Sequence, residues 1–129
     1  MFKISEVVKQ CAISADTLRY YEKIQLLPPI HRNDSGIRLY NKQDISSISF
    51  IKRAQYMGFS LAEIAKLLAF RKDPQHAKTE VRQLANDKLI AINEHLSQLK
   101  TLKNELTLLV NLCNAADDGC PIIKGLEIP

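Results

Sequence analysis

The chain has 129 residues, of which 46% are hydrophobic and 25% charged, so it is long enough for one compact domain plus an extended element and too apolar to be disordered. Four glycines and five prolines are too few for a many-stranded sandwich or barrel, and the sequence lacks the run of about 18 apolar residues that a membrane span needs. The first residues reach an acid, Glu6, before any apolar run, which predicts no secretory signal and a cytoplasmic protein.

The net charge of +4 is unevenly distributed along the chain. Residues 1–70 carry ten Lys or Arg against six Asp or Glu, whereas residues 71–129 carry eight of each. A basic half is typical of a module that binds a polyanion, because phosphate contacts need clustered cations. An ordinary solvated surface also carries an excess of this size, so charge alone does not decide between the two.

Two short helices are expected near the start of the chain. The first begins at Ser5, and the second spans residues 15–22 with Ser14 as its N-cap. The interval 10–13 is short and turn-like, so the pair predicts a helix-turn-helix, with a plain helical hairpin as the alternative. In a helix-turn-helix, residues early in the second helix reach base edges and phosphates in the major groove; here they include Thr17, Arg19 and Tyr20.

The adjacent tyrosines of the second helix cannot both lie on one face. The helical period of 3.6 residues separates Tyr20 from Tyr21, so we expect one ring in the core and the other on the surface. The surface ring can donate its hydroxyl to a phosphate.

A hairpin is predicted after the second helix. Pro28 and Pro29 end helicity, and the turn cluster at residues 33–36 separates two short extended runs. Arg32 and Arg38 flank this turn, where they can grip phosphates beside the helix-turn-helix.

Two further helices complete the first half. Asn41 caps a third helix that ends at Gly58, and its inward stripe includes Ile48 and Ile51. Residues 60–63 form a capping box that opens a fourth helix. The first 70 residues therefore suffice to bury one small core.

A long amphipathic helix is expected after the break at Asp73 and Pro74. Apolar residues recur there at steps of three and four: Leu89, Ile92, Leu96, Leu99, Leu102, Leu106 and Leu109. A helix of about 33 residues spans about 50 Å, which a domain of 70 residues cannot cover. A partner helix is needed, and a second copy of the chain in a twofold homodimer is the simplest.

Cys113 and Cys120 bracket a short acidic loop. Two thiolates on such a loop form a site for a soft metal, and two unrelated thiols or a redox pair are the alternatives. The usual four-ligand zinc pattern is absent, and His76 and His95 are distant in sequence. Cys11 is expected to be a small buried hydrophobe.

Catalytic motifs are absent from the sequence. It contains no glycine-rich phosphate loop, no HExxH and no GxSxG, so we predict that the protein is not an enzyme.

Four stretches together resemble the MerR family of bacterial transcription regulators: LRYYE at 18–22, RNDSGIRLY at 32–40, FIKRA at 50–54 and GFSL at 58–61. The cysteine loop followed by Pro-Ile-Ile is most similar to the copper-sensing branch. The resemblance covers essentially the whole chain. It implies an all-α fold with a small β-hairpin wing: a winged helix-turn-helix DNA-binding domain (1–72), an antiparallel coiled-coil dimerisation helix (73–112), and a metal-binding loop with tail (113–129).

The resemblance also implies a mechanism. A homodimer binds promoter DNA and distorts it when metal binds, so that RNA polymerase engages both promoter elements. The DNA contacts that it implies come from the second helix and the wing: Ser14, Thr17, Arg19, Tyr20, Lys23, Arg32, Arg38 and Tyr40.

The resemblance implies that Cys113 and Cys120 bind Cu(I), or Ag(I) by mimicry. Lys78 stands where the copper branch has a serine and the divalent branches a cysteine, and its cation can balance the charge of the thiolate site. The loop is one residue shorter than in copper sensors and matches a cadmium-sensing branch. A divalent soft metal such as Zn(II), Cd(II) or Pb(II), with His76 or an acid completing the shell, is therefore an alternative, and a thiol redox regulator is another.

Overall fold

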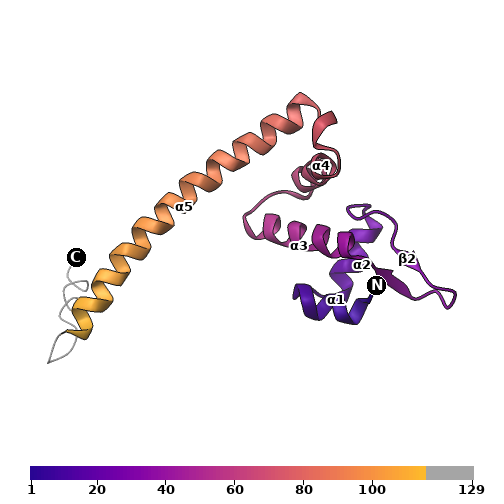
Figure 1. Ribbon diagram of the computed structural model, residues 1–129, viewed down its shortest axis with the longest axis horizontal. Coiled ribbons are helices and arrows are strands. Elements are labelled where there is room, and N and C mark those ends of the chain that lie inside the picture. Colours follow the sequence, from indigo (N-terminus) through magenta and orange to yellow (C-terminus); the bar gives the residue numbers. More distant parts are fainter. Residues whose placement is uncertain (116–129) are drawn as a thin grey trace. The chain divides into compact units, whose positions relative to one another are not determined.

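The computed structural model describes residues 1–115, which form the elements labelled in Figure 1. In chain order they are β1 (Phe2–Lys3), α1 (Ile4–Cys11), α2 (Ala15–Lys23), β2 (His31–Arg32), β3 (Arg38–Tyr40), α3 (Lys42–Tyr56), α4 (Leu61–Lys72), the 3-10 helix η1 (Pro74–His76) and α5 (Thr79–Asn114). The chain divides into two compact units, the first of which ends at Arg82. Within the described part, no helix is both long and apolar enough to span a membrane.

Side-chain caps set the starts of the helices, as the sequence predicts. The Ser14 hydroxyl accepts a hydrogen bond from the Thr17 amide at 3.1 Å and begins α2. Capping boxes begin α3 and α4, with Asn41 capping the first and Ser60 the second. These bonds satisfy amide groups that the first turn of a helix leaves without a partner, so they fix where each helix starts.

The wing contains one strand more than the predicted hairpin. The antiparallel pair of β2 and β3 is confirmed, and β1 joins the other edge of β3, with Phe2 opposite Tyr40. The turn between β2 and β3 closes where the Asn33 side-chain oxygen accepts from two backbone amides and Gly36 adopts a φ of 78°. A strand of two residues has no alternation to detect, so β1 was not predicted from the sequence.

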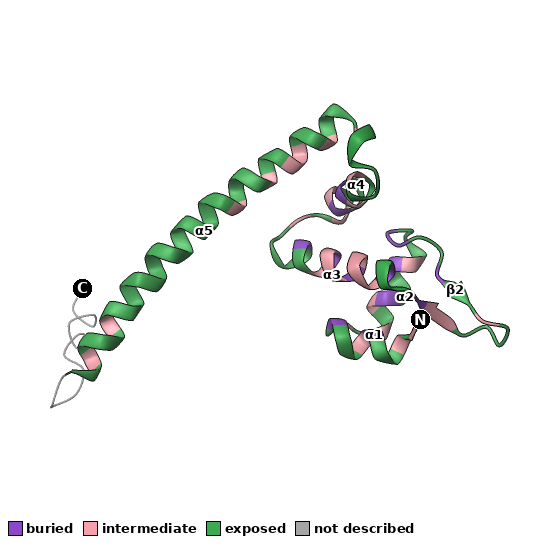
Figure 2. Cartoon of the chain, viewed as in Figure 1, coloured by how far each residue is buried: buried purple, intermediate pink, exposed green. Residues whose placement is uncertain are grey.

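The core of the first unit draws on five of its elements (Figure 2). Six side chains are fully enclosed: Val7, Leu18, Tyr40, Ile48, Ile51 and Ile64. Of the two adjacent tyrosines, Tyr21 is 3% exposed and Tyr20 is 46% exposed, which confirms that one packs inside. The Tyr21 hydroxyl donates to the Gln55 side chain, and burial raises the pKa of Tyr21 above its ordinary value.

Helix α5 has no core of its own. Its 36 residues include no buried side chain, and the helix is green or pink throughout Figure 2. At a rise of 1.5 Å per residue it is about 54 Å long. The predicted long helix is therefore confirmed, and it extends past Cys113 to Asn114.

Candidate nucleic-acid interface and metal site

One face of α2 carries exposed cationic and aromatic side chains. Leu18 and Tyr21 turn into the core, which leaves Arg19, Tyr20 and Lys23 exposed. Arg19 forms an ion pair with Asp16 at 3.1 Å, in which both side chains are at least half exposed. Such a pair is weak in water, so the guanidinium can exchange Asp16 for a phosphate at little cost.

At the start of α2, two hydroxyl groups lie together. The Ser14 and Thr17 oxygens are 2.6 Å apart, and Ser14 is exposed. The N-terminus of a helix carries a partial positive charge and unpaired amides, so hydroxyl donors there suit contact with an anion.

Glu22 of α2 contacts both arginines of the wing. Its Oε2 accepts from Arg38 Nε at 2.7 Å, and its Oε1 lies 3.9 Å from Arg32 Nη2. Arg32 also donates to the carbonyl oxygen of Gly36 at 3.0 Å. The two wing arginines are thus held beside the exposed face of α2, where they supply a second set of cationic donors.

Tyr40 does not lie on this surface. Its side chain is 0% exposed, and its hydroxyl has no hydrogen-bond partner. Burial, and then the charge of Glu22, raise the pKa of its phenol. The expectation that Tyr40 contacts DNA is therefore corrected, because an enclosed hydroxyl cannot reach a phosphate; Tyr40 is a core residue that pairs with Phe2 across the sheet.

Two residues of this unit were missed from the sequence. Glu22 is separated from Arg32 and Arg38 by 10 and 16 positions, and no local pattern links them. The Lys52 ammonium donates to the carbonyl oxygens of Cys11 and Ala12, so a side chain from α3 neutralises the C-terminus of α1. Only the fold brings these partners together.

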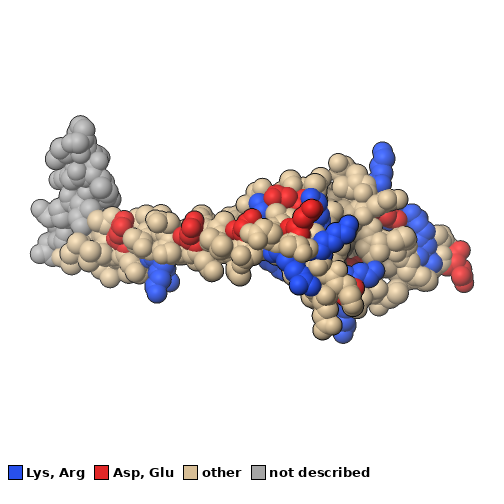
Figure 3. Space-filling view, turned by 90° about the horizontal axis from the view of Figure 1, so that it is seen from above, with Lys and Arg blue, Asp and Glu red and all other residues tan. Residues whose placement is uncertain are grey.

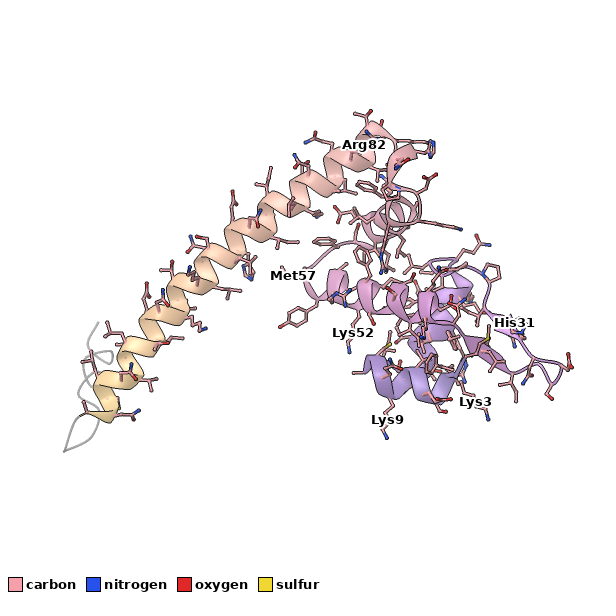
Figure 4. The ribbon with its side chains drawn as sticks, viewed as in Figure 1. Lys3, Lys9, His31, Lys52, Met57 and Arg82 are labelled. Carbon is pink, nitrogen blue, oxygen red and sulfur yellow. The ribbon has the colours of Figure 1, made fainter. Side chains whose placement is uncertain are left out.

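Further cations of the first unit lie on α1 and α3. In Figure 4, the side chains of Lys9 on α1 and Lys52 on α3 extend to the same side of the first unit. Figure 3 shows Lys and Arg groups spread over the visible face of this unit, with acidic groups between them. This visible face thus carries groups of both signs rather than a uniform basic patch, in keeping with a net charge of only +4.

One of the two predicted metal ligands, Cys113, is at the end of α5. Cys113 lies in its last turn, is partly exposed and takes part in a disulfide bond. Cys120 lies outside the described residues. Within residues 1–115, no three His, Cys, Asp or Glu side chains gather in a way that could hold a metal ion.

The other residues considered for the metal site lie far from Cys113 along the chain. Lys78 is exposed and immediately precedes the first turn of α5, at the opposite end from Cys113. The Nδ1 of His76 lies 2.9 Å from an oxygen of Asp73, and His95 is midway along α5. One straight helix cannot bring its two ends together, so Lys78 and Cys113 of the same chain do not form one site.

Comparison with known proteins identifies the family to which this architecture belongs. Residues 2–70 match the family described as "MerR HTH family regulatory protein", and residues 45–109 match "MerR, DNA binding". An uncharacterized HTH-type transcriptional regulator of Pseudomonas aeruginosa is 39% identical over 95% of this chain and 94% of its own length. The HTH-type transcriptional regulators CueR of Escherichia coli O6:H1 and ZntR of E. coli K12 are each 32% identical, over 96% and 98% of this chain and 93% of theirs.

A solved structure extends the likeness to three dimensions. The transcription regulator PbrR691 from Ralstonia metallidurans, in complex with lead(II), is 30% identical, covers 98% of this chain and 99% of its own, and superposes with a TM-score of 0.60. The helix-turn-helix, wing and long helix of this chain are thus those of a known class of DNA-binding regulators, which are not enzymes. The chain belongs to the MerR family of helix-turn-helix transcriptional regulators.

Proposed function

We propose that this protein is a metal-responsive transcription regulator that binds promoter DNA as a homodimer. One observation carries the proposal: α5 combines an uncovered apolar stripe with a cysteine in its last turn. The stripe calls for a partner helix, and the cysteine would supply a metal ligand at the end of that proposed pairing surface. The lead(II) complex of the relative at 30% identity supports a metal as the signal.

The DNA contacts are proposed to come from α2 and the wing. Donors on the exposed face of α2 would read base edges and bind phosphates, and the wing arginines would bind flanking phosphates. The proposed residues are Ser14, Thr17, Arg19, Tyr20, Lys23, Arg32 and Arg38. Because a dimer presents two such faces, its operator would be a palindrome.

An antiparallel pairing of α5 would complete the metal site. In a single chain, Lys78 and Cys113 lie at opposite ends of a helix of about 54 Å. Antiparallel pairing brings the start of one helix beside the end of the other, so Lys78 would face the Cys113 of the second copy. Its ammonium would balance the negative charge of a site with two thiolates and a monovalent ion.

The proposed metal is Cu(I), with Ag(I) as its mimic, held by Cys113 and Cys120. Two thiolates suit a soft monovalent ion, and such an ion would fix the geometry of the loop at the end of α5. The dimer would then distort the operator so that RNA polymerase engages both promoter elements. Divalent Zn(II), Cd(II) or Pb(II) is the alternative within the same function, with an acid or His76 of the second copy as a third ligand.

A competition experiment tests this function. The reduced protein is titrated with Cu(I) against a Cu(I) chelator, and separately with Zn(II) and Cd(II). We expect one Cu(I) site for each cysteine pair and loss of transcriptional induction in Cys113→Ser and Cys120→Ser, with DNA binding retained. Cys11→Ala is the matched control, since Cys11 is buried in the first unit. Full induction by copper in Cys113→Ser would rule the site out.

The disulfide at Cys113 supports a second candidate, a thiol redox regulator. In this case oxidation would replace metal as the signal. Treating the metal-free protein with an oxidant would then induce transcription, and metal added to the reduced protein would not. Induction by metal under reducing conditions, without any response to oxidant, excludes it.

A further inference from the structure

We infer that Glu22 is a positioning residue that joins α2 to the wing and orients the Arg38 guanidinium for contact with DNA. This inference rests on the proposed binding of DNA by α2 and the wing. One carboxylate of α2 reaches both strands of the hairpin, with Oε2 2.7 Å from Arg38 Nε and Oε1 3.9 Å from Arg32 Nη2.

The register of the hairpin explains why an acid is needed there. Arg32 and Arg38 are directly opposite each other on β2 and β3. Like charges at opposed positions of an antiparallel pair repel and destabilise the pairing. The Glu22 carboxylate lies within reach of both cations and offsets that repulsion, so the arginines remain together on one face.

The geometry of the contact leaves Arg38 able to bind an anion. The hydrogen bond to Glu22 uses Nε, and the two terminal nitrogens carry the other four N–H donors of the guanidinium. Both side chains are largely covered, with Glu22 21% and Arg38 26% exposed, so solvent screens this pair less than a surface pair. The side chain of Arg38 is therefore held in one orientation before any phosphate arrives.

The negative charge of Glu22 distinguishes a positioning role from direct attraction to DNA. A carboxylate near a phosphate-binding surface repels DNA, so Glu22 cannot act as an electrostatic contact. Its contribution must come from the placement of the wing relative to α2, because a recognition helix and a wing fit one duplex only at a fixed spacing. Loss of Glu22 should then reduce affinity for the operator and spare affinity for unrelated DNA.

The test compares Glu22→Ala and Glu22→Gln with wild type on two duplexes of equal length. One duplex is selected from random sequence by the wild-type protein, and the other is a scrambled version of it. For Glu22→Ala we expect about a tenfold loss of affinity for the selected duplex, a salt slope shallower by about one, and unchanged or tighter binding of the scrambled duplex. Glu22→Gln, which keeps a hydrogen-bond acceptor, should recover part of the loss.

Two controls keep the result interpretable. Asp34→Ala removes one negative charge from an exposed position in the wing turn and should leave the preference between duplexes unchanged. In an Arg38→Ala background, Glu22→Ala should cause little further loss of operator affinity, because the residue that it positions is already gone. The thermal midpoint of each variant shows whether the unit still folds.

The outcomes separate this inference from the proposed function. Equal losses on both duplexes, or fully additive effects of the two substitutions, would overturn the positioning role of Glu22. If wild type itself shows no preference for any duplex, the proposed function fails instead. If Arg38→Ala weakens operator binding and Glu22→Ala does not, the inference alone is wrong.

Discussion

In the first unit six side chains are completely enclosed, whereas none of the 36 residues of α5 is buried. The two regions have apolar residues in similar supply, and they differ in what covers them. In the first unit, helices and a small sheet converge from several directions. Along α5, Leu96, Leu99 and Leu102 are each about half exposed.

The buried core of the first unit and the uncovered stripe of α5 suit two different tasks, contact with DNA and pairing with a second molecule. A unit that encloses its own core holds its DNA-contacting face in place without help. The stripe of α5 is open, and in the proposed homodimer the pairing of two such helices would set the distance between the two DNA-binding faces. The proposed metal at the end of α5 would then act on that spacing without unfolding either face.

The largest expected effect comes from a charge in the α5 stripe. Leu102→Asp should convert the dimer to a monomer and weaken operator binding by about 100-fold or more, because two linked half-sites become one. Sedimentation and DNA titration measure the two effects. Asn104→Asp, two residues along the same helix, introduces the same charge outside the stripe and should remain dimeric. A Leu102→Asp protein that stays dimeric would show that another surface makes the dimer.

The next-largest effect is expected from a substitution that creates a cavity in the core of the first unit. Ile51 is fully buried, so Ile51→Ala should lower the free energy of unfolding by about 2–5 kcal/mol. Tyr56→Ala, on the same helix with 91% of the side chain exposed, should change it by less than about 0.5 kcal/mol. Urea unfolding measures both. Equal effects of the two substitutions would contradict the independent core.

A smaller effect is expected at the wing. Arg38→Ala should weaken binding to the operator by about tenfold, as much as Glu22→Ala does, and reduce the slope of log affinity against log salt by about one, since one phosphate contact is lost. Arg82→Ala, at the start of α5, serves as the control for the loss of a cation. An unchanged slope for Arg38→Ala would remove this residue from the phosphate contacts.

The smallest effect concerns the enclosed phenol of Tyr40. Its hydroxyl is buried without a partner, so Tyr40→Phe should raise stability by about 1 kcal/mol and leave DNA affinity unchanged. Burial raises the pKa of Tyr40 above its ordinary value near 10. The folded state therefore favours the protonated phenol, and its contribution to stability is complete below about pH 10 and is lost as pH rises through the raised pKa.

Urea unfolding between pH 8 and 11 checks this. Wild type should lose more stability across that range than Tyr40→Phe, in which Tyr21 still has its raised pKa. A drop in operator affinity in Tyr40→Phe would restore a DNA-contacting role for the hydroxyl.

Much of the architecture was predictable because its signals are local. The caps at Ser14, Asn41 and Ser60 each act over three residues, so they can be identified from the sequence and are found in the structure. The alternation of Tyr20 and Tyr21 between surface and core likewise follows from the helical period. The short strand β1 has no such signal and was missed.

The residues of the proposed interface also fall into two groups, those that the sequence predicts and those that only the structure shows. A position in a motif cannot distinguish a residue that points outward from one that points inward, and so Tyr40 was expected on the surface. The contact of Glu22 with Arg32 and Arg38 depends on how α2 packs beside the hairpin, which no spacing within the chain encodes.

The sequence by itself determined the order of helices, the hairpin, the length of α5 and its apolar stripe, because periodicity and capping act between residues a few positions apart. Only the tertiary structure decided which tyrosine is enclosed without a partner, which acid holds the wing, and which lysine covers the end of α1. These depend on groups brought together from 10 to 41 positions apart, and such meetings are set by packing around one shared core.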